Sequence, residues 1–147
     1  MSTTAPTTLN PAIIGQAEKH HTAILARALA GTMLDEKQWI TLNQTLAAGD
    51  SVERTAHIAR IAAMTQWKTA DVDTALAALL DGGLLRTAPG DQVEVTEAGR
   101  TLAGKVRAES GVILQAAYGA VAPDDLATAA RVLATITARM AQELAHA

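Results

Sequence analysis

Two adjacent histidines, His20 and His21, are the first residues whose type suggests chemistry. Imidazole binds metals and, with a pKa near neutrality, serves as an acid or a base. Neighbouring residues of a helix point about 100° apart, so this pair is poorly placed to chelate one metal ion. His57 and His146 lie far away along the chain, no HxxxH spacing occurs and cysteine is absent. The sequence therefore predicts no metal site, and it leaves His21 as either a packed side chain or a polar contact in a ligand pocket.

Two tryptophans, Trp39 and Trp67, are the large flat side chains of a chain that has one tyrosine and no phenylalanine. They either fill the core or line a cavity for a small aromatic ligand, because ligand pockets are mostly apolar with a few polar anchors. Asn43 follows Trp39 by four residues and so shares its helical face. The candidate ligand-binding residues are therefore His21, Trp39, Asn43 and Trp67.

Known catalytic patterns do not occur in the sequence. It has no nucleophile elbow, no phosphate loop and no zinc motif. The carboxylates of Asp71 and Asp73 are two residues apart and diverge on a helix. No catalytic residue and no cofactor is predicted, and an enzymatic role is not the leading interpretation.

The composition indicates a helical protein. Hydrophobic residues make up 49% of the chain, and most of them are Ala and Leu, which are strong helix formers. Without cysteine there is neither a disulfide framework nor a thiol sensor. No apolar run reaches the roughly 18 residues of a membrane span, and residues 1–8 do not resemble a signal peptide. We expect a cytoplasmic protein without a membrane partner.

Caps and apolar periodicity predict six helices and two strands. Asn10 and Pro11 begin the first helix, Asp35 with Gln38 forms a capping box for the second, and Pro123 begins the last. The predicted helices cover residues 10–31, 35–49, 52–64, 69–81, 96 onward and 123 onward. The predicted strands cover residues 84–86 and 92–96, with a turn at 88–91 between them.

This order places a helix–turn–helix before a two-stranded wing. We predict a flexible segment at 1–9 and a single domain at 10–147, with a winged lobe at about 35–100 and dimerisation helices at 10–31 and 100–147. The fold class is mainly α: a winged helix-turn-helix with a two-stranded β-wing and long N- and C-terminal dimerisation helices. The outer helices carry apolar stripes that a small lobe cannot cover, and this favours a homodimer. The stripe residues are Ile14, Ile24, Leu133, Ile136, Met140 and Leu144.

Three segments resemble the MarR family of bacterial transcription regulators. They are LAALLDGGLL at 76–85, VEVTEAGR at 93–100 and LDEKQW at 34–39, and the similarity extends over about residues 10–145. The resemblance implies a homodimer whose fourth helix enters the DNA major groove while the wing reaches toward the minor groove. It also implies control by a phenolic or other aromatic ligand that binds between the dimer helices and the DNA-binding lobe.

Carried onto this chain, the resemblance implies a set of DNA contacts. Basic side chains would meet phosphates, and polar residues of the fourth helix would approach bases. The predicted phosphate contacts are Arg54, Arg60, Lys68 and Arg86, and the predicted base contacts are Thr69, Asp73 and Thr74.

The chain departs from the family pattern in its charges. Asp71 and Asp73 stand where the family usually has hydroxyls, and the wing tip at 88–92 lacks the family's arginine. Residues 53–100 carry five basic and seven acidic side chains, a net charge of −2, whereas DNA-binding faces are usually basic. Three interpretations remain: a ligand-responsive DNA-binding regulator, a winged-helix scaffold that has lost DNA binding and acts as a small-molecule-binding protein or enzyme, and a protein-interaction module.

Overall fold

The computed structural model describes residues 8–49 and 51–147. Most of the predicted flexible segment 1–9, and Asp50 at the predicted end of the second helix, lie outside the described residues. The chain divides into two compact units that meet between Ser110 and Gly111, and each is described by itself.

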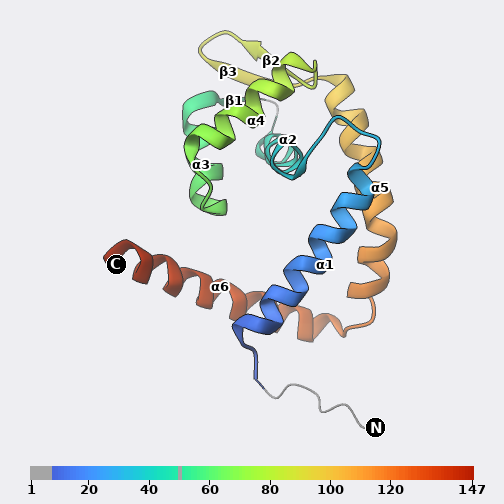
Figure 1. Ribbon diagram of the computed structural model, residues 1–147, viewed down its shortest axis with the longest axis vertical. Coiled ribbons are helices and arrows are strands. Elements are labelled where there is room, and N and C mark those ends of the chain that lie inside the picture. Colours follow the sequence, from blue (N-terminus) through green and yellow to red (C-terminus); the bar gives the residue numbers. More distant parts are fainter. Residues whose placement is uncertain (1–7, 50) are drawn as a thin grey trace. The chain divides into compact units, whose positions relative to one another are not determined.

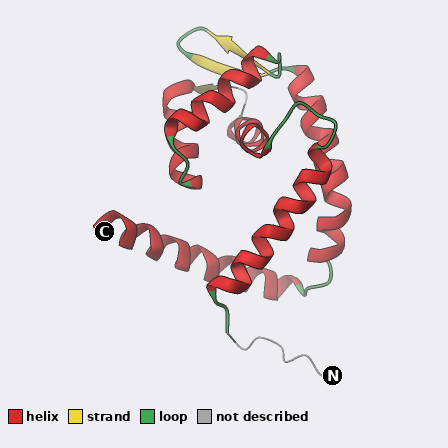
Figure 2. Cartoon of the chain, in the orientation of Figure 1, coloured by secondary structure: helices red, strands yellow, loops and turns green. Residues whose placement is uncertain are grey.

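The first unit contains a helix–turn–helix followed by a hairpin (Figure 1). Its helices are α1 (Pro11–Leu29), α2 (Glu36–Ala48), α3 (Arg54–Thr65), α4 (Thr69–Asp81) and the first part of α5 (Glu97–Tyr118). Its strands are β1 (Ser51–Glu53), β2 (Leu85–Ala88) and β3 (Gln92–Val95). The strands form one small sheet beside a mainly helical body (Figure 2), so the predicted fold class is confirmed.

Local side-chain caps set the predicted helix starts. The Asn10 side chain accepts a hydrogen bond from the backbone N–H of Ile13 at 3.1 Å. Asp35 accepts from the Gln38 N–H at 2.8 Å, and the Gln38 side chain accepts from the Asp35 N–H at 3.0 Å. This reciprocal pair is the capping box predicted for α2.

A third strand corrects the prediction that a helix begins at Val52. Residues 51–53 form β1, which pairs antiparallel with β3 and places Val52 opposite Val93. The α3 helix begins only at Arg54, because the Glu53 carboxylate accepts hydrogen bonds from the backbone N–H groups of Thr55 and Ala56 at 3.2 and 2.6 Å. The sheet order is therefore β1–β3–β2, with β2 and β3 forming the wing hairpin.

The core of the first unit joins α2, α3 and α4 to the sheet, with α4 packed most extensively on α2. Its largest fully buried side chains include Leu42, Ile61, Leu76, Leu79 and Val93. The wing is fixed to α5 at Gly99, where an added Cβ would lie 2.3 Å from the Leu84 carbonyl oxygen. The Thr96 hydroxyl strengthens this joint by donating to the Gly83 carbonyl at 2.7 Å.

The second unit consists of the end of α5, a short turn and α6 (Pro123–His146). The α6 helix begins with the predicted Pro123 and has no buried residue. An exposed apolar stripe runs along it, made by Leu133, Ile136, Met140 and Leu144. Across the described part of the chain, no helix is both long enough and apolar enough to span a membrane.

Candidate nucleic-acid interface

The α4 helix separates a buried face from an outward face. Val72, Leu76 and Leu79 are buried in the core. The predicted contact residues Lys68, Thr69, Asp73 and Thr74 are all exposed. No side chain caps the amino end of α4, where Lys68 is the cap residue. Helix amino ends favour anions because their first N–H groups lack partners, so this end suits a phosphate.

A groove of about 450 Å³ lies between α3 and α4. It brings Arg54 of α3 next to Thr69 and Asp73 of α4, three residues of the predicted set. The remaining lining residues are Thr55, Ile58, Ala59 and Ala70. Arg54 is held there by Asp73, because its Nη2 lies 2.9 Å from Asp73 Oδ1.

The second acidic residue of α4 is also paired. Asp71 Oδ2 lies 3.5 Å from the Lys37 Nζ of α2. The same Lys37 Nζ lies 5.6 Å from the centroid of the Trp67 ring, a cation–π distance. Both carboxylates of α4's first half are therefore partly neutralised within the fold. Sequence reasoning missed Lys37, since it lies on a different helix 34 positions before Asp71.

The basic residue of the wing, Arg86, lies opposite an acidic residue, Glu94. Arg86 of β2 pairs with Glu94 of β3 in the strand register, and its Nε and Nη2 donate to Glu94 Oε2 at 3.1 and 2.9 Å. The Arg86 side chain is nevertheless 67% exposed. At the tip, Gly90 and Asp91 both have positive φ, 79° and 58°. Exposed ion pairs contribute little to stability, so Arg86 can be redirected toward a phosphate at small cost.

Arg60 of α3 is the exposed end of a hydrogen-bond chain that runs into the core. Its Nη2 donates to His57 Nδ1 at 2.7 Å, which makes that nitrogen the acceptor. His57 Nε2 then carries the proton and donates to Thr45 Oγ1 at 2.9 Å, and Thr45 donates to the Thr41 carbonyl at 2.7 Å. Burial and the nearby Arg60 charge lower the pKa of His57 to about 4. The chain joins α2 to α3 and holds the guanidinium of Arg60, whose Nη1 also donates to Gln44 Oε1 of α2 at 3.3 Å.

The four candidate ligand-binding residues occupy different environments. Trp39 is in the core, 8% exposed, and Trp67 packs partly buried against that core. Asn43 Oδ1 accepts from the Nε of Arg107 at 3.1 Å and also from its Nη2. His21 is on the exposed side of α1, where its Nδ1 contacts the Ala17 carbonyl. Their role in ligand binding stays a prediction.

The comparisons with known proteins find likeness in structure. No protein-family model matches the sequence, and no curated protein matches it. A MarR-family transcriptional regulator from Silicibacter pomeroyi superposes with a TM-score of 0.73 at 18% identity, covering 88% of each chain. CouR from Rhodococcus jostii, bound to p-coumaroyl-CoA, superposes at 0.71 with 16% identity, covering 84% of this chain and 88% of its own. The reduced form of MarR from E. coli superposes at 0.66 with 15% identity, covering 89% and 95%.

These identities are low, and the likeness extends over most of each chain. The arrangement of the helix–turn–helix and wing is therefore what the proteins share. The chain has the winged helix-turn-helix fold of the MarR-family transcription regulators.

Proposed function

We propose that the chain is a homodimeric transcription regulator that binds double-stranded DNA through α4 and the wing and responds to a small molecule. The observation that carries the proposal is the outward face of α4, where Lys68, Thr69 and Thr74 are exposed at an uncapped helix amino end. In this arrangement a phosphate meets both a lysine and free backbone N–H groups.

Acidic residues on α4 would repel DNA phosphates, but both of those in its first half form ion pairs within the fold. Asp71 and Asp73 face Lys37 and Arg54, so their charges are compensated at short range. Arg54 lies in the α3–α4 groove with Thr69, and a phosphate can share its guanidinium with Asp73. We infer that Asp73 orients Arg54 and does not simply repel DNA.

Dimerisation is supported by the exposed apolar stripe of α6 (Leu133, Ile136, Met140 and Leu144) and by Ile14 on α1, which is also exposed. Apolar stripes of this length are usually covered by a partner. The small-molecule response is supported by the fold and by CouR, a structural neighbour that was crystallised with p-coumaroyl-CoA. The predicted ligand residues His21, Trp39, Asn43 and Trp67 belong to this proposal.

The second candidate is a winged-helix scaffold that no longer binds DNA. It is favoured by the ion pair between Glu94 and the Arg86 guanidinium of the wing. The net charge of −2 over residues 53–100 agrees with it. This candidate predicts that DNA from the protein's own upstream region binds no better than unrelated DNA.

A pair of lysine variants tests the proposed interface. Lys68→Ala should weaken DNA binding and flatten its salt dependence, because one phosphate contact fewer releases fewer counterions. Lys105→Ala is the control, since Lys105 is also an exposed lysine and lies on α5. Fluorescence anisotropy at two salt concentrations measures both quantities. Equal binding by the two variants would remove Lys68 from the interface.

A further inference from the structure

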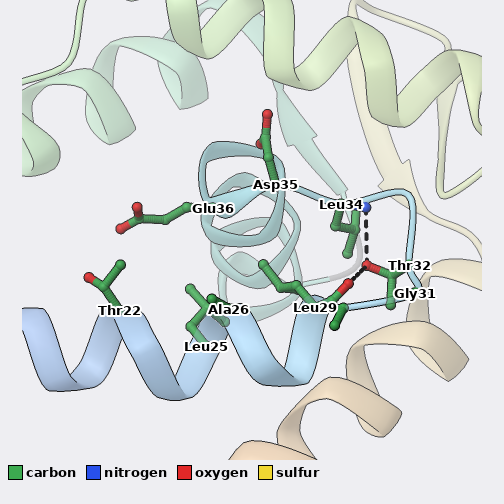
Figure 3. A pocket seen from close by; sticks show the side chains of 10 residues that line it. Thr22, Leu25, Ala26, Leu29, Gly31, Thr32, Leu34, Asp35 and Glu36 are labelled. Atoms are coloured by element: carbon green, nitrogen blue, oxygen red, sulfur yellow. Dashed lines mark hydrogen bonds between the residues drawn. The ribbon is translucent and has the colours of Figure 1, made fainter.

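A cavity of about 460 Å³ lies where the end of α1 meets the start of α2 (Figure 3). Leu25, Leu29 and Leu34 form an apolar floor, and Leu29 and Leu34 belong to the buried core. Thr22 and Glu36 lie at one end of it in Figure 3. The other lining residues are Ala26, Ala30, Gly31, Thr32 and Asp35. None of the four ligand-binding candidates is among them.

The lining of this cavity is acidic. It includes the carboxylates of Asp35 and Glu36 and contains no lysine, arginine or histidine. The Asp35 carboxylate caps α2 through the Gln38 N–H and points away from α1 in Figure 3. The Glu36 carboxylate, in contrast, has neither a hydrogen bond nor an ion pair with any residue in 8–49 or 51–147.

The two helix ends at the cavity carry opposite partial charges. The last turn of α1 lines the cavity with Leu29 and Ala30, and the carboxyl end of a helix is partly negative, whereas the amino end of α2 is partly positive. The Asp35 carboxylate already caps that amino end, so the Glu36 carboxylate sets the sign of the charge at the rim. The α1–α2 loop is fixed by Thr32, whose hydroxyl donates to the Leu29 carbonyl at 2.6 Å and accepts from the Leu34 N–H at 3.1 Å. A preformed apolar floor beside the Glu36 carboxylate therefore favours a ligand that carries a positive charge.

We propose that this cavity binds an amphipathic organic cation, with an aromatic or aliphatic body on the three leucines and an ammonium group near Glu36 and the Thr22 hydroxyl. A cavity of this size accommodates a small aromatic amine. Ligand binding here needs no DNA, and only its regulatory meaning rests on the proposed function. Ligand binding in this cavity can affect α4 through the core, because Leu29 and Leu34 belong to the same core cluster as Val72 and Leu76 of α4.

Three probes of matched shape test the class of ligand: 2-naphthylmethylamine, 2-naphthylmethanol and 2-naphthoate. Calorimetry on the full chain without DNA should give the tightest binding for the amine, by about three- to fivefold over the alcohol, as expected for one exposed charge pair. The carboxylate should bind weakest. The advantage of the amine should shrink in high salt, because exposed charges are screened.

Two variants locate the site. Glu36→Gln should remove most of the amine's advantage over the alcohol, while Glu109→Gln, which removes an exposed charge outside the cavity, should leave it unchanged. Ala26→Leu narrows the cavity and should weaken all three probes. Thermal unfolding without probe confirms that each variant is folded. The proposal is overturned if the amine shows no saturable binding, if the three probes bind alike, or if the two glutamine variants behave alike.

A DNA titration with and without the amine separates this inference from the proposed function. If the protein binds the amine but not DNA, the proposed regulator function is wrong and the proposed cation site stands. If the protein binds DNA but not the amine, the cation site is wrong and the proposed regulator function stands.

Discussion

The buried His57 should make the fold sensitive to mild acid. The residue is 3% exposed, and its Nδ1 accepts a hydrogen bond from Arg60. Burial, followed by the Arg60 charge, lowers its pKa from 6.5 to about 4. Because the folded-state pKa is lowered for a group that gains charge on protonation, protons bind the unfolded chain more readily. The contribution of neutral His57 to the free energy of unfolding is fully present above about pH 6.5, and it is lost as the pH falls from there toward 4.

The magnitude follows from the two pKa values. The full shift corresponds to roughly 3.5 kcal/mol at about 1.4 kcal/mol per pKa unit. At about pH 5 the unfolded histidine is almost wholly protonated and the folded one is mostly neutral, so about 2 kcal/mol should be lost relative to pH 7.5. For a domain with a typical stability of about 5–15 kcal/mol, that loss is readily measurable.

Urea unfolding at pH 7.5 and pH 5 measures this loss directly. His57→Gln removes the titrating group, so its unfolding free energy should fall by about 2 kcal/mol less than that of the wild type over the same pH interval. His20→Gln, at an exposed position, should retain the wild-type pH dependence. Arg60→Gln should show a smaller loss than the wild type, because the repelling charge is gone. The reasoning is refuted if His57→Gln and the wild type lose the same free energy.

Three further predictions concern the wing joint, α4 and α6. Gly99→Ala should destabilise the fold by about 1–3 kcal/mol through overpacking, because its Cβ meets the Leu84 carbonyl; Gly104→Ala, which meets nothing within 4 Å, should be neutral or stabilising in the same urea assay. Asp73→Ser should raise non-specific DNA affinity about three- to fivefold at low salt by freeing Arg54; a fall in specific affinity instead would mean that Asp73 contacts a base. Ile136→Asp should shift sedimentation toward monomer, whereas the neighbouring exposed Thr135→Asp should not; a wild type that is already monomeric at micromolar concentration would contradict the dimer.

The features that the sequence predicted correctly are those coded locally. Asn10 and Asp35 mark helix starts through hydrogen bonds within three residues. The second strand of the wing was recognisable because polar and apolar residues alternate from Gln92 to Val95, with the period of a half-buried strand. In the structure their burial alternates in the same way. By contrast, β1 is three residues long, too short to show a period, and its pairing with β3 joins segments about 40 residues apart.

For the candidate DNA-contact residues, the sequence predicts which side chains are exposed but not which of them form ion pairs. The exposure of Thr69, Asp73 and Thr74 follows from the helical period of the apolar residues around them. Which cation meets which carboxylate depends on how α2, α3 and α4 pack, and no local pattern records that Arg54 reaches Asp73. The hydrogen-bond chain from Arg60 to the buried His57 was missed for the same reason.

The most direct test of the central claim is an anisotropy titration of labelled DNA from the protein's own upstream region against unrelated DNA of equal length. The titration is run from about 50 to 200 mM salt, a range over which phosphate contacts lower affinity steeply. The regulator predicts tighter binding to the upstream fragment and a negative slope of log affinity against log salt, reduced in Lys68→Ala. Equal, weak binding to both fragments at the lowest salt would contradict it and favour the scaffold without DNA binding.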